Sequence, residues 1–553
     1  MKVEMIFLLG GAIGLLLVLV FSHYRARVKL TQSIRQKWGK VPESASYIQS
    51  DSEESLKAAW LNAQIYQTFD AKVDDLTWED LDLWGVFQQL NLTYSSVGSE
   101  ALYQQLRNYN FGQAEQYEEL IQFFTANPAL REQVQSLFAD LGKQDQNHSK
   151  DYLAQGSKKQ LGNVGRYYLL GSLPLVGIGL TFIFPPLGLI LTLLSIFINV
   201  LFYYTQKFRL EIELDSMRYL VQTIVSADKL SRLETPLQQQ IAKQVQAFKG
   251  IEHWAFSFRI KANSEAEIIF ELFNLIFMLP FISYNYVLKK ISVYNSEAVK
   301  LWELLGQLEV ALAILNFRTY MPLTCQPTFT TKNEVLAQES YHPLVTAAVP
   351  NPIAWKKATL ITGSNASGKS TYVKSIAINC ILAQTINTTT ARQFLLASGH
   401  VCSAMAVEDD LVEGDSYFVA EIKAIKRLLT QVEVGDTCYC FIDEILKGTN
   451  TIERIAASAA VVKWLTKPNC LALIATHDIE LTTILKNDCD NLHFEEQVSV
   501  EKGITFDYRV KEGPATTRNA IKLLQVFDYP AELVTRATAE ANYFEQHKNW
   551  KTL

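Results

Sequence analysis

The residues best suited to chemistry lie in one glycine-rich segment, GSNASGKS, at positions 363–370. It fits the phosphate-binding pattern G-x-x-x-x-G-K-[ST] in full. Glycines let backbone N–H groups close around phosphate oxygens, and a following helix adds its positive end. We expect Lys369 to reach the β- and γ-phosphates of ATP and the Ser370 hydroxyl to ligate Mg²⁺. The predicted nucleotide-binding residues are Gly363, Ser364, Asn365, Ala366, Ser367, Gly368, Lys369, Ser370 and Thr371.

Two acids and a histidine further along the chain extend this chemistry. The apolar segment TCYCFIDE ends in Asp443 and Glu444, 74 and 75 residues beyond Lys369. We expect Asp443 to hold the Mg²⁺ shell and Glu444 to polarise the attacking water as general base. A second apolar segment, LALIAT, leads into His477. This histidine could sense the γ-phosphate by hydrogen bonding, although a lone histidine at a strand end is often structural.

The elements that must position these residues are alternating strands and helices. Residues 358–362 (ATLIT) predict a short strand before the glycine-rich segment, and residues 371–384 predict a helix with an apolar stripe. The segments before Glu444 and His477 predict further strands of one sheet, whose carboxyl edge is where an α/β fold places its ligands. The sequence therefore predicts a C-terminal α/β P-loop ATPase domain, at about 331–553.

Together these motifs resemble the ATPase domain of the MutS family of DNA mismatch repair proteins, which is of the ABC type. The segments that carry the resemblance are TGSNASGKSTYVK at 362–374, DDLVEGDSYFVAE at 409–421, DEILKGTN at 443–450 and THDIELT at 476–482. YHPLV at 341–345, VPN at 349–351 and the segment 508–537 are similar to the parts that flank that domain. The resemblance implies a homodimer in which ATP hydrolysis opens and closes a clamp.

The segment 409–421 lies where the family has a signature loop that acts in trans. The resemblance implies that Ser416 of this loop caps a helix and points at the phosphates bound by the partner subunit. This chain has DSYF at 415–418, where the family usually has Ser-Thr-Phe, so the trans contact is less well supported than the P-loop.

A fainter resemblance reaches back along the chain. Residues 80–107 and 303–317 are similar to the first and last parts of the MutS helical core and lever domain. We therefore predict that residues 28–166 and 206–330 form a helical domain in two parts. Each segment by itself is only an amphipathic helix, so another kind of helical bundle remains an alternative.

Between the two helical parts lies a segment typical of a membrane protein. The 40 residues between Arg166 and Lys207 contain no Asp, Glu, Lys, Arg or His. Pro185 and Pro186 divide them into two runs of 18 residues, each about 27 Å long as a helix. Tyrosines at both outer ends suit a membrane interface. We predict a transmembrane hairpin at 167–205, with a re-entrant or buried hairpin as the alternative.

Two further apolar runs bear on the topology. Residues 5–22 are free of charge and are followed by six basic residues within 25–40, which predicts an N-terminal anchor (1–27) rather than a cleaved signal peptide. Three spans would place a multi-pass protein in the membrane with its ATPase domain in the cytoplasm. The run 268–288 contains Glu271 and Pro280. We predict a buried core helix there, because a central acid costs about 2.5–3.5 kcal/mol on membrane insertion.

The charge balance bears on nucleic acid as a partner. With 51 basic and 57 acidic residues the net charge is −6, whereas binding to a phosphate backbone needs Lys and Arg on one face. Only residues 1–72 precede the core-like region, too few for the mismatch-reading domain of repair members. We predict double-stranded or branched DNA as a candidate partner without mismatch specificity. The alternative is a membrane-remodelling or ABC transporter-like ATPase that does not act on DNA.

The 7 cysteines predict neither disulfides nor a zinc site. All of them lie at or beyond Cys325, and no two have the C-x-x-C spacing. Cys438 and Cys440 alternate along the apolar segment before Asp443, where we expect them to act as small core residues.

Overall fold

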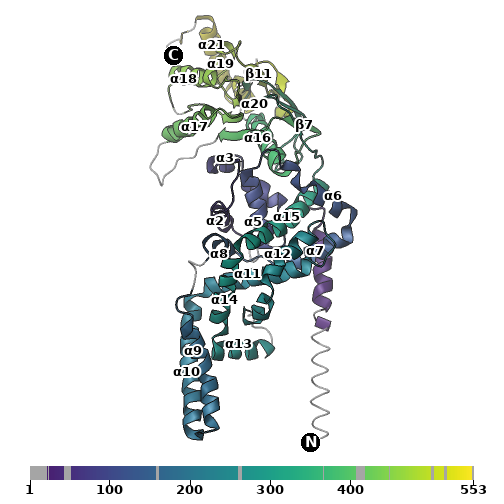
Figure 1. Cartoon of the computed structure of the whole chain (residues 1–553). Helices are drawn as coiled ribbons and strands as arrows, with labels where there is room; N and C mark the ends of the chain where they lie inside the picture. The colour runs from purple at the N-terminus through teal and green to yellow at the C-terminus, as the bar shows by residue number, and fades with distance from the viewer. Residues whose placement is uncertain are drawn as a thin grey trace. The chain divides into compact units, whose positions relative to one another are not determined.

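The computed structural model describes residues 21–22, 24–42, 51–156, 161–258, 265–364, 366–405, 417–447, 449–499, 503–515, 520–547 and 549–550 (Figure 1). The predicted anchor at 5–22 lies almost wholly outside these residues, as do the predicted site residues Asn365 and Ser416. The chain divides into two compact units. The first comprises Met1–Thr68, Phe87–Gln105 and Gln116–Tyr320, and the second comprises Phe69–Val86, Leu106–Glu115 and Met321–Leu553.

The first unit is helical. Its main helices are α2 (Glu53–Ala63), most of α5 (Ser96–Arg107), α6 (Glu118–Ala126), α7 (Pro128–Leu141), α8 (Ser149–Gln155), α11 (Glu211–Leu230), α12 (Gln238–Val245), α14 (Leu279–Val293) and α15 (Asn295–Tyr320). α15 and α5 pack closely, since a Cβ on Gly306 of α15 would lie 2.6 Å from the Cβ of Ala101. The buried Glu309 carboxylate accepts hydrogen bonds from the backbone N–H of Tyr94 and the Ser95 hydroxyl at the start of α5. Burial raises the pKa of Glu309 to about 7.

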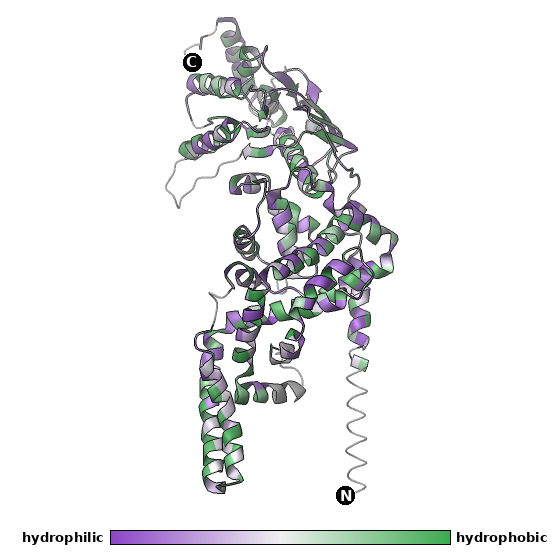
Figure 2. Ribbon diagram, in the orientation of Figure 1, coloured by the Kyte–Doolittle hydropathy of each residue, from purple (hydrophilic) through white to green (hydrophobic). Residues whose placement is uncertain are grey.

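A hairpin of two long helices belongs to this unit. α9 (Gly165–Thr181) and α10 (Pro185–Arg209) coincide with the two runs expected to form helices. They pack through small residues, because a Cβ on Gly177 would lie 2.5 Å from the Thr192 hydroxyl and one on Gly188 2.2 Å from the Thr181 nitrogen. Their outer faces are apolar and exposed (Figure 2). Insertion of this hairpin into a membrane stays a prediction.

The length and composition of the described helices single out one of them. α10 is long and apolar enough to cross a membrane by itself, and the bent pair Glu271–Phe277 and Leu279–Val293 would be a second such element if it formed one span. α9, with 17 residues, is eight residues shorter than α10, with 25.

The apolar run at 268–288 is not one buried core helix, so that prediction is wrong. The chain breaks at Met278, which has φ 55°, into α13 (Glu265–Phe277) and α14, and the two are bent by 77°. Pro280 cannot donate the backbone hydrogen bond that a continuous helix would need. α14 is largely buried, as predicted for the whole run, but α13 exposes Leu272 and Phe273.

The second unit contains a six-stranded sheet of order β14-β11-β6-β10-β9-β8. The first five strands in chain order are parallel: β6 (Thr359–Thr362), β8 (His400–Ala404), β9 (Cys438–Asp443), β10 (Cys470–Ala475) and β11 (Asp490–His493). β14 (Lys511–Glu512) pairs with β11 in the antiparallel direction. The strands expected before the glycine-rich segment, Glu444 and His477 are therefore confirmed as β6, β9 and β10.

Helices and a second sheet complete this unit. α16 (Lys369–Ile386), α17 (Tyr417–Glu433), α18 (Thr451–Trp464), α20 (Ala520–Val526) and α21 (Ala531–His547) accompany the large sheet, and a four-stranded sheet has the order β3-β7-β4-β5. Cys438 and Cys440 are buried in a core cluster with the apolar side chains of β9, β10 and α17, which confirms their role as small core residues. All 7 cysteines are free thiols.

The second unit also takes in two short segments from early in the chain, 69–86 and 106–115. β1 (Ala71–Lys72) pairs with β2 (Asn108–Tyr109), and α3 (Asp75–Asp80) packs on β8. Asp80 accepts hydrogen bonds from the Ser403 hydroxyl at 2.6 Å and the Met405 backbone at 3.1 Å, while Asp74 pairs with Arg427 of α17. This differs from the expected boundary, which assigned 28–166 wholly to the helical domain.

Candidate active site

The glycine-rich segment forms a tight turn between β6 and α16. Gly363 and Gly368 have φ values of 146° and 107°, which favour glycine. Space demands glycine as well, because a Cβ on Gly363 would lie 2.6 Å from the Phe494 carbonyl oxygen. A Cβ on Gly368 would lie 3.2 Å from the ring of Tyr508. Because these two positions carry no side chain, the backbone N–H groups of the turn stay accessible at the N-terminus of α16, as anion binding requires.

Lys369 is buried at the first position of α16, with 5% of its surface exposed. Its ammonium donates hydrogen bonds to the carbonyl oxygens of Gly363 at 2.9 Å and Ser364 at 2.8 Å. Burial lowers the pKa of Lys369 to about 8, although the negative charges of Asp443 and Glu496 oppose that shift. A phosphate would offer this cation stronger, charge-assisted acceptors than the two carbonyls.

The two acids and the histidine reach the same edge of the sheet from separate strands. β10 lies between β6 and β9, and its Ala475 pairs in register with Ile361 and Asp443. Asp443 and Glu444 follow at the end of β9, and the backbone N–H of Glu444 donates to the Ala475 carbonyl at 2.9 Å. Glu444 itself has φ 63°, an unusual backbone conformation for a glutamate.

The Glu444 carboxylate lies between two nitrogen donors. One oxygen is 2.9 Å from Nε2 of His477, and the other is 2.8 Å from the Lys447 ammonium. A carboxylate neighbour would raise the pKa of His477, yet burial and the nearby charges of Lys369 and Lys447 lower it. With its Nε2 at this distance from the Glu444 oxygen, His477 can donate a hydrogen bond that holds the carboxylate in place.

A cavity of about 570 Å³ brings these groups together. The predicted site residues that line it are Ser364, Ala366, Gly368, Lys369, Ser370, Thr371, Glu444 and His477. Asp443 does not line the cavity, although its charge acts on Lys369. Ser370 and Asp443 supply the hard oxygen donors that Mg²⁺ prefers. Cavity size, buried cation and oxygen donors thus fit ATP with Mg²⁺.

The cavity has further walls that sequence reasoning did not assign to the site. Tyr508, Phe494 and His342 line it, and Tyr508 lies against the glycine turn. Glu496 accepts a hydrogen bond from the Ser364 hydroxyl at 2.5 Å. His342 and Tyr508 belong to two of the family-like segments, 341–345 and 508–537. The family resemblance therefore pointed to these segments but assigned no role in the site to either residue.

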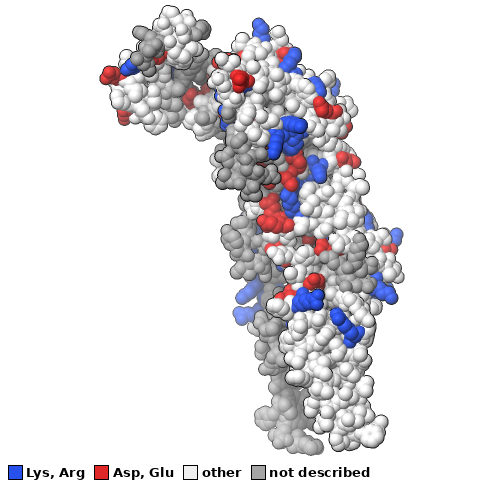
Figure 3. All heavy atoms as spheres, turned by 90° about the vertical axis from the view of Figure 1, so that its left-hand side faces the viewer, with Lys and Arg blue, Asp and Glu red and all other residues white. Residues whose placement is uncertain are grey.

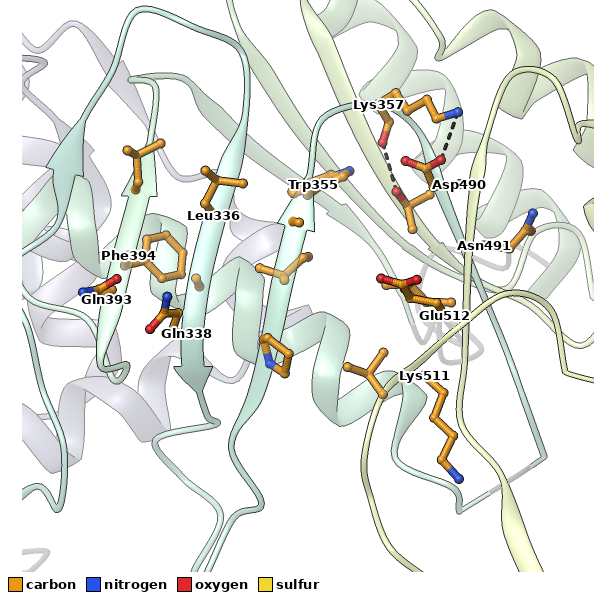
Figure 4. Close-up of a pocket in the computed structure, with 18 of the residues that line it drawn as sticks. Leu336, Gln338, Trp355, Lys357, Gln393, Phe394, Asp490, Asn491, Lys511 and Glu512 are labelled. Carbon is orange, nitrogen blue, oxygen red and sulfur yellow. Dashed lines mark hydrogen bonds and ion pairs between the residues drawn. The ribbon is translucent and has the colours of Figure 1, made fainter.

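A larger cavity of about 1310 Å³ lies elsewhere in this unit (Figure 4). It runs from the four-stranded sheet, with Leu336, Trp355 and Phe394, to the β11 and β14 side of the six-stranded sheet. Lys357 and Asp490 form an ion pair of 2.9 Å on its wall. Its lining includes none of the predicted site residues, so we assign nucleotide chemistry to the smaller cavity.

Comparison with known proteins agrees with this geometry. The family MutS domain V matches residues 359–545, which span β6 through α21 and hold the whole predicted site. This C-terminal part of the chain is therefore similar to MutS domain V. The predicted family resemblance is therefore confirmed for the C-terminal part.

Curated relatives in this family match the same part of the chain. The DNA mismatch repair protein MutS of Pseudothermotoga lettingae is 29% identical over 249 residues, which cover 43% of this chain and 30% of the relative. The protein of that name from Thermus thermophilus is 30% identical over 203 residues, covering 36% and 25%. That from Geobacillus sp. is 30% identical over 238 residues, covering 40% and 27%. The matched part of this chain thus spans less than a third of the length of these MutS relatives.

In this MutS-family domain the helix after the predicted signature loop contacts the loop after Glu444. The Glu421 carboxylate of α17 accepts a hydrogen bond from the Lys447 backbone N–H at 3.1 Å. Lys447 in turn pairs with Glu444. A displacement of α17 would therefore act on Glu444, the predicted general base, through the Glu421–Lys447 and Lys447–Glu444 contacts.

Proposed function

We propose that this chain binds and hydrolyses Mg²⁺·ATP in the part that is similar to MutS domain V. The observation that carries the proposal is the buried Lys369 ammonium at the N-terminus of α16, in one cavity with the Glu444–His477 pair. Steady-state ATP hydrolysis by the full chain, purified in detergent with and without Mg²⁺, tests it. A preparation that binds no ATP at millimolar concentration would contradict it.

The side chains divide the work of hydrolysis between them. Lys369 and the backbone N–H groups of the glycine turn hold the β- and γ-phosphates, and Ser370 with Asp443 hold Mg²⁺ when it is bound. Glu444 accepts the proton of the attacking water, while His477 keeps its carboxylate oriented. The ring of Tyr508 beside the glycine turn offers a flat surface to the adenine base.

The lowered pKa of Lys369 predicts that ATP affinity depends on pH. Bound phosphate favours the protonated lysine, so above a free-protein pKa of about 8 the chain must take up a proton to bind ATP. We expect the affinity to hold from pH 7 to 8 and then to fall, approaching tenfold per pH unit. Calorimetric titration at pH 7, 8 and 9 checks this. The variant Lys369→Arg keeps its charge over this range and should show no such fall, whereas an equal fall in both proteins would assign the effect to another group.

The MutS resemblance supports a homodimer that acts as a clamp. In this proposal the signature loop of each subunit completes the ATP site of the other, and hydrolysis opens the dimer. Dimer closure would engage the helical unit, because α15 leads along the chain directly into the second unit at Met321. Double-stranded or branched DNA is the candidate cargo of the clamp.

Any DNA binding should show no preference for a mismatch. The net charge of −6 favours weak binding that falls steeply as salt rises from about 50 to 200 mM. Such binding should also depend on the ATP state, because ATP hydrolysis is proposed to open and close the clamp. Fluorescence anisotropy with matched and mismatched duplexes measures both properties. A mismatch preference of about tenfold, or 1.4 kcal/mol, would contradict this expectation and favour a repair function. Loss of all binding at low salt would favour the membrane-remodelling alternative.

We also propose that the α9–α10 hairpin anchors the chain in a membrane. Its exposed side chains include Leu175, Phe182, Leu194 and Phe197, each more than half exposed. In Figure 3 the visible face of the hairpin is free of Lys, Arg, Asp and Glu, and basic side chains gather above it. Exposure of so much contiguous apolar surface to water is unfavourable, whereas lipid would cover it.

The membrane proposal predicts a definite topology. Reporter fusions after Ser50, after Lys150 and at the C-terminus should all report the cytoplasm, and a fusion at Pro185 should report the opposite side. Arg166, Lys207 and Arg209 at the base of the hairpin favour this orientation. A cytoplasmic signal from the Pro185 fusion would instead indicate a hairpin that is buried or re-entrant.

A further inference from the structure

Two prolines leave two helical carbonyl groups without their usual donors. Pro174 lies inside α9 and has no N–H for the carbonyl of Leu170, four residues earlier. Pro280, the second residue of α14, likewise has none for the carbonyl of Ile276 in α13. In water such groups bond to solvent, but in lipid each needs a partner from the protein itself.

One side chain meets both needs. Asn199 of α10 is fully buried, and its amide nitrogen donates to the Leu170 carbonyl at 2.9 Å and to the Ile276 carbonyl at 2.8 Å. A single amide therefore joins α9, α10 and α13. Such a bond adds most where water is absent, because the competing partners are missing.

The end of α13 is seated tightly on the hairpin. A Cβ on Gly171 of α9 would lie 2.5 Å from the carbonyl oxygen of Phe277, so only glycine admits this approach. Gly171 and Asn199 lie three and five residues from Tyr168 and Tyr204, the exposed tyrosines at the base of the hairpin. At 1.5 Å per residue, α13 meets the hairpin about 5 to 8 Å beyond that level. A helix that lies in a membrane interface is buried to about this depth.

The faces of α13 differ as those of an interfacial helix do. Asn274 and Leu275 are buried in the protein, and the Asn274 amide donates to the Ser257 carbonyl at 3.1 Å. Leu272 and Phe273 are 52% and 51% exposed. Figure 1 shows α13 running across the direction of α9 and α10, as a helix in the membrane plane would.

Glu271, the acid among residues 271–277 of α13, lies at the charged end of the hairpin. Glu271 pairs with Lys207 at 2.6 Å and accepts a hydrogen bond from the Tyr203 hydroxyl at 3.1 Å. This pairing removes the objection that an acid in the run 268–288 excludes contact with lipid, because the carboxylate stays at the level of the basic residues.

We propose that α13 is a further membrane-contacting element, a half-helix pinned to the hairpin by Asn199, with Leu272 and Phe273 against lipid. The inference rests on the proposed insertion of the α9–α10 hairpin. Lipid is the occupant because the exposed face of α13 adjoins the exposed apolar faces of α9 and α10, which need the same cover. The element also precedes α14 and α15, which lead along the chain into the second unit.

Fluorescence quenching in vesicles tests the inference on the full chain. A polarity-sensitive fluorophore is attached to a single introduced cysteine in a Cys325→Ser background, where the remaining six cysteines are buried. The labelled variants are Phe273→Cys in α13, Phe197→Cys in the hairpin and Val293→Cys at the end of α14; the native side chains are 51%, 59% and 65% exposed. Each is reconstituted in phosphatidylcholine vesicles and quenched either by a nitroxide on the lipid acyl chain or by aqueous iodide.

The three labelled positions distinguish lipid contact by α13 from membrane insertion of the α9–α10 hairpin. We expect lipid quenching at 273 and 197 and iodide quenching at 293. Lipid quenching at 197 with iodide quenching at 273 would overturn the role of α13 and leave the anchor standing. Iodide quenching at 197 would overturn the anchor itself, and the inference with it. Protection of 273 from both quenchers would show that protein, not lipid, covers α13.

A substitution at Asn199 tests the pin. In Asn199→Leu the probe at 273 should lose its lipid quenching and gain iodide quenching, while the probe at 197 keeps its lipid quenching. Ser195→Ala is the matched control, since Ser195 is one turn away, equally buried, and donates only to Thr192 of its own helix. Unchanged quenching at 273 in Asn199→Leu would overturn the positioning role of Asn199.

Discussion

The variant Lys369→Ala should lose ATP binding by about 100-fold or more. Lys369 is the buried cation of the cavity, and it lies at the N-terminus of α16 where the phosphates would be held. Hydrogen bonds between charged groups contribute about 1.5–3 kcal/mol each, and loss of such contacts to two phosphates corresponds to roughly this factor. Titration with a fluorescent ATP analogue measures the dissociation constant directly.

The loss should not come from unfolding. A buried ammonium is costly to desolvate, as the lowered pKa of Lys369 shows, so alanine at this position should leave the thermal midpoint unchanged or raise it. Lys357→Ala is the control, because Lys357 pairs with Asp490 on the wall of the other cavity. If Lys369→Ala bound ATP as tightly as Lys357→Ala, the phosphates would have to bind elsewhere.

The variant Glu444→Gln should bind ATP normally and hydrolyse it about 10²- to 10⁴-fold more slowly, the range that a general base contributes. Glutamine keeps the shape of the side chain and can still accept the Nε2–H of His477, so the cavity is preserved. It cannot take a proton from water. If the dimer proposal holds, ATP should also trap this variant in the dimeric state.

Single-turnover hydrolysis and ATP binding should be measured together for this variant. Glu453→Gln, an exposed acid in the first turn of α18, is the matched control and should keep the parental rate. Parental hydrolysis by Glu444→Gln would show that another group activates the water. Loss of both binding and hydrolysis would point to a structural role for the Glu444–Lys447 pair.

The local sequence determined most of the nucleotide site. The glycine spacing, the lysine that follows it and the apolar segments ending in acids act within a few residues, because a strand–turn–helix unit is specified by its own backbone needs. Gly363 and Gly368 adopt the positive φ values that explain their type. The two helices of the hairpin followed equally directly from their uncharged runs.

Other parts of the site depend on residues far apart in the chain. Phe494 reaches the glycine turn because β11, which precedes it, pairs with β6, and Tyr508 reaches the turn because the chain then returns past that turn. α3 joins the second unit although it precedes domain V by more than two hundred residues. Periodicity carries no information on such pairings, since many strand orders and docking partners satisfy the same pattern of buried side chains.

The run at 268–288 shows, within one segment, both what the sequence predicts and what only the tertiary structure decides. Its hydrophobicity predicted one buried core helix, although the run contains Pro280. Only the tertiary structure shows that the helix breaks there. The break leaves the Ile276 carbonyl without a helical donor, and Asn199, about eighty residues earlier in the chain, supplies one. Sequence by itself determined which backbone groups would need a partner; the packing of α9, α10 and α13 decided which side chain provides it, since that choice depends on distances that only the folded chain sets.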